Sequence, residues 1–108
     1  MQPEMRYIEL KTGYNDDGPA WIARVTFSKT GRTVYFNGRK LQRLNVGSGN
    51  HYDKETLEDF WVSGVKKSGS NRHTWGRGKI MVQRDVLEEF LAWTGQTTLN
   101  TGLYELAE

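Results

Sequence analysis

The chain has 108 residues, of which 36% are hydrophobic and 26% are charged, and its formal net charge is +2. It contains no cysteine, which excludes disulfides, thiolate zinc sites and cysteine nucleophiles, and no apolar stretch approaches the roughly 20 residues of a membrane-spanning helix. We therefore expect one globular domain over residues 1–108, located in the cytoplasm, with a core rich in aromatic side chains.

The first half of the chain predicts a meander of strands. Residues 5–11, "MRYIELK", alternate between apolar and polar side chains, which places Tyr7 and Glu9 on the outer face of a half-buried strand. Turn residues follow, and a second strand is expected over residues 20–28, "AWIARVTFS". Residues 37–38, Asn-Gly, lie between "TVYF" and "RKLQRL". This dipeptide favours a type I′ hairpin turn, because both of its central residues need positive φ.

The middle of the chain predicts two further strands. Residues 45–59 read as a loop with one helical turn near residues 54–59. "FWVSGVKK", residues 60–67, and "KIMVQ", residues 79–83, have the composition of strands. Because the segment between them is rich in Gly, Ser and basic residues, we expect the two strands to pair as one long hairpin.

One helix is expected near the carboxyl end. Asp85 with Glu88 three residues later resembles a capping box, and Gly95 stands where a C-cap glycine is common. The apolar stripe that would pack this helix consists of Val86, Leu87, Phe90 and Leu91. The tail, residues 96–108, is expected either to add a short edge strand at residues 103–106 or to fray. About five strands and one C-terminal helix predict an α+β fold: a small, mostly antiparallel sheet or a partly open barrel of the SH3-like or OB-like kind.

Basic residues are concentrated in two windows. Residues 18–52 and residues 60–84 together hold twelve of the fifteen Lys and Arg and no Asp or Glu. The second window contains "KKSGSNRHTWGRGK", residues 66–79, in which cations surround a tryptophan. Cations that meet phosphates and aromatic rings that stack on bases are the two components of a nucleic-acid-binding surface. The residues predicted for such a surface are Lys66, Lys67, Arg72, His73, Trp75, Arg77, Lys79, Tyr35, Arg39 and Lys40.

Two other functions stay open. An exposed hairpin or sheet edge would suit a protein-interaction module that binds by strand addition. His51 and His73, the only histidines, have the chemistry of a general base and a general acid for RNA cleavage, although we favour binding over catalysis. "GNHYD" offers His51 and Asp53 as metal ligands, with Asp16 and Asp17 as further oxygen donors, but without a third His or any Cys we expect no metal site. No phosphate-binding or dinucleotide-binding fingerprint is present, so we expect no cofactor.

The chain also resembles a known group of sequences. "YIELKTGYNDDGPAWIARVTFSKTGRTVYFNG", with "GNHYD", "WVSGVKK", "RHTWGRGKI" and "FLAWTG" further on, is similar to small uncharacterised bacterial proteins. Some of these carry the name 1-deoxy-D-xylulose-5-phosphate synthase, a thiamine-diphosphate enzyme. Such enzymes are several times longer, and the Gly-Asp-Gly run followed by a metal-binding Asn is missing here. The resemblance therefore implies a bacterial cytoplasmic protein and transfers no catalytic residue.

Overall fold

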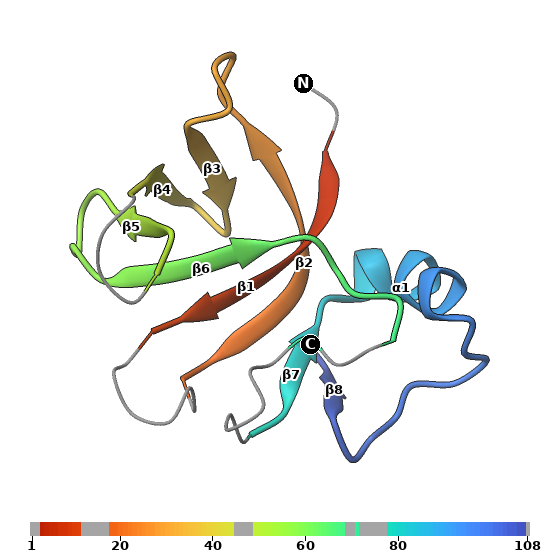
Figure 1. The fold of residues 1–108 in the computed structure, drawn as a ribbon. Coiled ribbons are helices and arrows are strands. Elements are labelled where there is room, and N and C mark those ends of the chain that lie inside the picture. Colours follow the sequence, from red (N-terminus) through yellow and green to blue (C-terminus); the bar gives the residue numbers. More distant parts are fainter. Residues whose placement is uncertain (1–2, 12–17, 45–48, 69–70, 72–77, 108) are drawn as a thin grey trace.

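The computed structural model describes residues 3–11, 18–44, 49–68, 71 and 78–107 (Figure 1). Its strands are β1 (Glu4–Leu10), β2 (Ala20–Phe27), β3 (Thr33–Phe36), β4 (Arg39–Arg43), β5 (His51–Asp53), β6 (Asp59–Ser63), β7 (Ile80–Val82) and β8 (Tyr104–Leu106). A single 3-10 turn, η1 (Arg84–Val86), leads into the helix α1 (Leu87–Thr94). The small α+β fold that the sequence predicted is confirmed.

Strands β1 to β6 form a closed antiparallel barrel. Each strand pairs with the next in chain order, and β6 returns to β1, where Leu10 lies opposite Phe60. Closure leaves no free edge among these six strands, because each has a neighbour on both sides. Two further strands extend the sheet in parallel: β7 pairs with β2, and β8 pairs with β7. The predicted meander therefore continues until it closes.

The barrel interior is filled by alternate residues of its strands. The buried side chains of this cluster are Ile8, Ala23, Val25, Val34, Phe36, Leu41, Phe60 and Val62. Trp21 and Phe36 face this interior: their ring centroids lie 5.2 Å apart, and Trp21 packs against the same cluster. The period-2 pattern of each strand thus supplies one wall of the barrel core.

A second core lies on the outer side of β1 and β2, beneath α1, β7 and β8. Its buried members are Met5, Tyr7, Ala20, Ile22, Val65, Ile80, Val82, Val86, Phe90 and Tyr104. The rings of Phe90 and Tyr104 meet edge to face, with centroids 4.9 Å apart. Strand β1 is therefore covered on both faces, and the expectation that Tyr7 and Glu9 face solvent is wrong: both are 1% exposed.

Two predicted glycine turns are confirmed. Asn37 and Gly38 have φ of 47° and 77° in the β3–β4 turn, as a type I′ hairpin requires. Gly95 has φ of 73° at the end of α1. The amides of Gly95 and Gln96 donate to carbonyl oxygens of the last helical turn, which is the role of a left-handed C-cap.

The predicted pairing of the later strands is wrong. Residues 60–67 and 79–83 do not form a hairpin, because β6 pairs with β1 and β5 while β7 pairs with β2. Barrel closure occupies both edges of β6, so β7 must find its partner elsewhere. Strand β5 was also expected to be loop. Its three residues are too few to show a period in the sequence, and the turn after it closes with a hydrogen bond from the Leu57 amide to the Asp53 carbonyl.

The predicted capping box does not form. Neither η1 nor α1 has a side-chain hydrogen bond at its N-cap. Asp85 lies within η1, and its carboxylate is 3.7 Å from Arg24 Nε. Arg24 also donates to Glu89 at 2.9 Å and to the Asp85 carbonyl at 2.9 Å. The acids of this segment therefore attach the helix to β2 instead of capping it.

Gly49 is required where the chain approaches β6. A Cβ built on Gly49 would overlap the backbone carbonyl of Phe60, which cannot move without disrupting the barrel. We expect Gly49→Ala to lower the free energy of unfolding by about 1–3 kcal/mol, as measured by urea denaturation. Gly64→Ala is the matched control, since a Cβ there meets no atom within 4 Å. Equal stability of the two variants would contradict this close approach.

Candidate functional site

In the described part of the chain, basic residues gather at one end of the barrel, whereas the other end carries acids together with Lys11, Arg39, Lys40 and Lys54. Connections of an up-and-down barrel alternate between its ends, so the β2–β3 turn lies at the same end as the last residue of β4. We define the basic end by Lys29, Arg32 and Arg43. We define the acidic end, at the β5–β6 turn, by Asp53, Glu55, Glu58 and Asp59. A ligand that is a polyanion would be attracted to the basic end.

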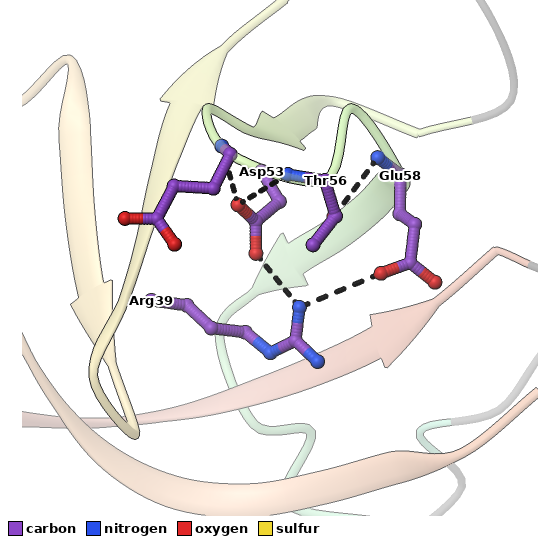
Figure 2. Close-up of polar contacts among 5 residues, drawn as sticks. Arg39, Asp53, Thr56 and Glu58 are labelled. Atoms are coloured by element: carbon purple, nitrogen blue, oxygen red, sulfur yellow. Dashed lines mark hydrogen bonds and ion pairs between the residues drawn. The ribbon is translucent and has the colours of Figure 1, made fainter.

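At the acidic end, Asp53 organises the turn (Figure 2). Its Oδ1 accepts hydrogen bonds from the amides of Glu55 at 2.8 Å and Thr56 at 3.2 Å, and its Oδ2 accepts one from Arg39 Nη1 at 2.7 Å. Burial opposes ionisation of Asp53, but these hydrogen bonds and the guanidinium charge outweigh it and hold the pKa of Asp53 below its usual range. The carboxylate is therefore ionised and fixed at neutral pH.

Arg39, one of the predicted binding residues, is already engaged there. Besides Asp53, its Nη1 lies 3.5 Å from a carboxylate oxygen of Glu58. Its guanidinium carbon lies 5.2 Å from the centroid of the Phe60 ring. Two carboxylates balance the charge of Arg39, so the structure gives this residue a role in closing the acidic end.

The basic end places like charges next to each other. The Arg43 amide donates to the Arg32 carbonyl at 2.8 Å, so the two residues are cross-strand neighbours. Within the described residues, no carboxylate lies within ion-pair distance of Lys29, Arg32, Arg43 or Lys40. Like charges directly opposite each other destabilise a sheet. An anion between these cations would relieve that repulsion.

His51 lies beside this end but is buried. It begins β5 opposite Arg43, and its side chain was expected in an exposed loop, yet the residue is 7% exposed. Its Nδ1 lies 2.9 Å from Asn50 Oδ1, and Asn50 in turn bonds both the amide and the carbonyl of Val62. Burial, and then the charge of Arg43, lower the pKa of His51. His51 is therefore neutral at neutral pH, and it contacts Asn50, whose side chain links the start of β5 to Val62 of β6.

No metal-binding cluster is assembled in the described part. There, no three His, Asp or Glu side chains are grouped closely enough to hold a metal ion. Asp53, the second residue of the suggested pair in "GNHYD", is engaged with Arg39. His73, Asp16 and Asp17 lie outside the described residues.

The remaining predicted residues fall on two sides of the barrel. Tyr35 and Lys40 face each other across the β3–β4 hairpin, and Tyr35 is 41% exposed. Figure 1 shows that the chain after β6 runs toward α1 and away from β3 and β4, and this segment carries Lys66 and Lys67. Lys67 Nζ lies 4.7 Å from the centroid of the Trp93 ring on α1. Lys79 immediately precedes β7.

Four of the ten predicted residues lie outside the described residues. These are Arg72, His73, Trp75 and Arg77. The described residues of the set therefore form one group on β3–β4 and another near α1 and β7, and their role in binding stays a prediction.

Sequence reasoning left several surface residues out of the site. Arg32 and Arg43 lay inside a basic window, but only strand pairing shows that they are neighbours. Trp61 was not included in the predicted surface, yet it is 40% exposed between the buried Phe60 and Val62. The alternation in "FWVS" was the signal that would have placed Trp61 on the outer face.

Comparisons with known proteins add no relative from which a function can be transferred. No protein-family model matches the chain, and neither does any curated protein or any solved structure. Among the described residues, no helix is long and apolar enough to span a membrane. The surface of the barrel is therefore the source of evidence on function.

Proposed function

We propose that the protein binds nucleic acid through the basic end and the adjoining outer face of β3 and β4. The observation that carries this proposal is the juxtaposition of Arg32 and Arg43, next to Lys29, without a carboxylate partner among the described residues. Phosphate groups would place anionic oxygens between these cations. Each such contact releases condensed counterions, which drives binding at low salt.

The outer face of β3 and β4, between the basic end and the β3–β4 turn, suits the same ligand. Tyr35 exposes its ring beside Lys40, and a base can stack on such a ring while the cation meets its phosphate. The second core covers the opposite side of the sheet with α1, β7 and β8 (Figure 1). The β3–β4 face is therefore the side that the rest of the described chain leaves open.

The test is a charge reversal at the basic end, Arg32→Glu with Arg43→Glu. Fluorescence anisotropy with a labelled single-stranded oligonucleotide should show weaker binding. The slope of log K against log salt should become shallower by about 0.7 for each phosphate that the variant no longer neutralises. The melting temperature should change little, because the substitution replaces one cross-strand pair of like charges with another.

The matched control is Lys66→Glu with Lys67→Glu, which reverses the same number of charges on the α1 side. Binding by this control within about threefold of the parent is expected. Weaker binding by the control but not by the Arg32 and Arg43 variant would move the site to residues 66–79. If the parent does not bind single-stranded or duplex oligonucleotides at low salt, the proposal fails.

A second candidate, a protein-interaction module, is favoured by the position of β8. In the described part, β8 pairs with β7 alone, so its outer edge is available for strand addition. Leu103, beside this edge, is 49% exposed. A partner held by strand addition would bind with little dependence on salt, whereas nucleic-acid binding weakens steeply as salt rises.

A further inference from the structure

We propose that His51 completes the anion site at the basic end, where its Nε2 takes up a proton and donates a hydrogen bond to a phosphate group held by Arg32 and Arg43. This inference rests on the proposed function and deepens it, because it names a further phosphate-contacting group and makes binding dependent on pH. The two arginines alone would bind phosphate equally well at every pH near neutrality, since a guanidinium group stays charged.

Strand pairing places the three side chains next to one another. Thr33 of β3 is paired with Gln42 of β4. The next pair is Arg32 and Arg43, in which the Arg43 amide donates to the Arg32 carbonyl at 2.8 Å. Arg43 is in turn paired with His51 of β5. Directly opposite residues of neighbouring strands point to the same side of a sheet, with Cβ atoms about 5 Å apart. The three residues therefore form a short row across neighbouring strands.

This row lies on the inner side of the barrel wall, where the strands reach the basic end. His51 is paired with Phe60, and Phe60 belongs to the buried cluster of the barrel interior. Leu41, two residues before Arg43, belongs to the same cluster, and alternate residues of a strand share a face. His51 is 7% exposed, whereas both arginines are exposed. A ligand therefore reaches this row from the basic end.

The hydrogen bonds of Asn50 determine which nitrogen of His51 carries the proton. Asn50 Nδ2 donates to the Val62 carbonyl at 2.7 Å, and Asn50 Oδ1 accepts from the Val62 amide at 2.8 Å, so the side-chain amide has one orientation. His51 Nδ1 lies 2.9 Å from that Oδ1 and must be the donor. Neutral His51 therefore carries its proton on Nδ1, and its Nε2 is unprotonated.

The Nε2 atom of His51 is available to a ligand. In the described part, the His51 side chain makes no hydrogen bond other than the one to Asn50. No fully buried side-chain nitrogen or oxygen there lacks a hydrogen-bond partner, so Nε2 is within reach of solvent. An unprotonated Nε2 and a phosphate oxygen are both acceptors and cannot bond to each other. Protonation turns Nε2 into a donor that a phosphate oxygen accepts.

The charges near His51 favour a neutral ring in the free protein. Burial, and then the charge of Arg43, lower the pKa of His51. Lys29 adds a further positive charge at this end, and Arg6 of β1 is paired with Glu4 at 2.7 Å. Strand β6 contributes only apolar side chains to the inner face. A phosphate would neutralise the charge of Arg43 and favour the imidazolium form.

Binding should therefore strengthen as the pH falls. In the free protein His51 is neutral near pH 7, so a complex that contains the imidazolium takes up a proton as it forms. A lower pH supplies that proton and raises the affinity. The gain ends where the pH reaches the lowered pKa of the free protein, because His51 is then protonated before the phosphate binds.

The experiment measures binding of a fluorescent oligothymidylate without terminal phosphates, at constant low salt, from about pH 8 to about pH 6, the range in which imidazole changes charge. Phosphodiesters and thymine keep their charge over this range. We expect the parent to bind about five- to 100-fold more tightly at the lower pH, since uptake of one proton changes affinity by at most tenfold per pH unit. Calorimetry in two buffers of different ionisation enthalpy should detect the proton.

His51→Asn is the decisive variant. Its side-chain amide has a donor near the position of Nδ1, so the hydrogen bond to Asn50 is kept while Nε2 is removed. The pH dependence of binding should disappear, and the melting temperature shows whether the variant is folded. His73→Asn, which replaces the only other histidine, is the matched control and should keep the pH dependence. The parent gives a second test: the pKa of the His51 imidazole, followed by NMR, should rise when the oligonucleotide is added.

Equal binding at both ends of the pH range, or a pH dependence that persists in His51→Asn, overturns the inference. The proposed function then still stands if Arg32→Glu with Arg43→Glu weakens binding. Inorganic phosphate at constant ionic strength is the second probe. If it raises the pKa of His51 while no oligonucleotide binds, the phosphate site stands and the proposed function fails.

Discussion

Phe90→Ala is expected to lower the free energy of unfolding by about 3–5 kcal/mol. Phe90 is 2% exposed and packs edge to face on Tyr104, in the core that joins α1 to β1 and β2. The truncation leaves a cavity between rigid elements, and an α-helix of eight residues has little stability apart from its packing. Urea denaturation followed by circular dichroism measures the loss.

Leu91→Ala is the control for this change, because Leu91 is the next residue of α1 and is only half-buried. A smaller loss is expected there. The second core would not be a major contributor to stability if Phe90→Ala cost less than about 1 kcal/mol, since a buried Phe ordinarily costs several times that.

Asp53→Ala is expected to cost about 2–3 kcal/mol. It removes two hydrogen bonds to the Glu55 and Thr56 amides and one to Arg39 (Figure 2). Loss of a capping carboxylate and of a charge-assisted hydrogen bond is typically of this size. The cost is not larger because Arg39 is 36% exposed and can be hydrated after the substitution.

The pH dependence of stability tests the same carboxylate. The pKa of Asp53 is lower in the folded protein than in the unfolded chain, so its ionised form stabilises the fold at neutral pH. That contribution is lost as the pH falls below about 4, where the unfolded chain takes up the proton first. Asp53→Ala and Asp53→Asn should both lose this component. If stability fell below about pH 4 in either variant just as it does in the parent, Asp53 would not be the source of this pH dependence.

Local chemistry made much of the fold predictable. Asn37 and Gly38 determine their turn because few other residues adopt positive φ, and Gly95 ends α1 for the same reason. The alternation of apolar and polar side chains in the first strands predicted which residues face the interior of the sheet. The helix stripe was found because Val86 and Phe90 recur at helical spacing.

Pairing between distant segments was not predictable in the same way. Strand β6 closes the barrel on β1, some fifty residues earlier, and no local pattern in either strand encodes that partner. Once β6 is occupied, β7 pairs in parallel with β2, which overturns the expected hairpin. Tyr7 and Glu9 are buried because the outer face of β1 is covered as well, with Tyr7 in the second core that includes residues of β7, β8 and α1.

In the candidate site, too, local features were predictable from the sequence and contacts between distant residues were not. Composition revealed that cations gather in two windows, but it could not show that Arg32 meets Arg43 or that Lys67 lies near α1 instead of β3. Arg39 was assigned to binding because the sequence does not reveal its ion pair with Asp53, which lies 14 positions further along the chain. Trp61 was within reach of sequence reasoning through its strand alternation.

Chemical-shift mapping with a short single-stranded oligonucleotide at low salt tests the central claim most directly. Amide signals of the folded parent would be followed by two-dimensional 1H–15N spectra during the titration. We predict that shifts concentrate on β3, β4 and β5 and on the turn between β2 and β3, while α1 and residues 64–68 stay unchanged. Shifts confined to α1 and residues 64–68, or no shifts at all, would contradict a binding surface on the β3–β5 side of the barrel.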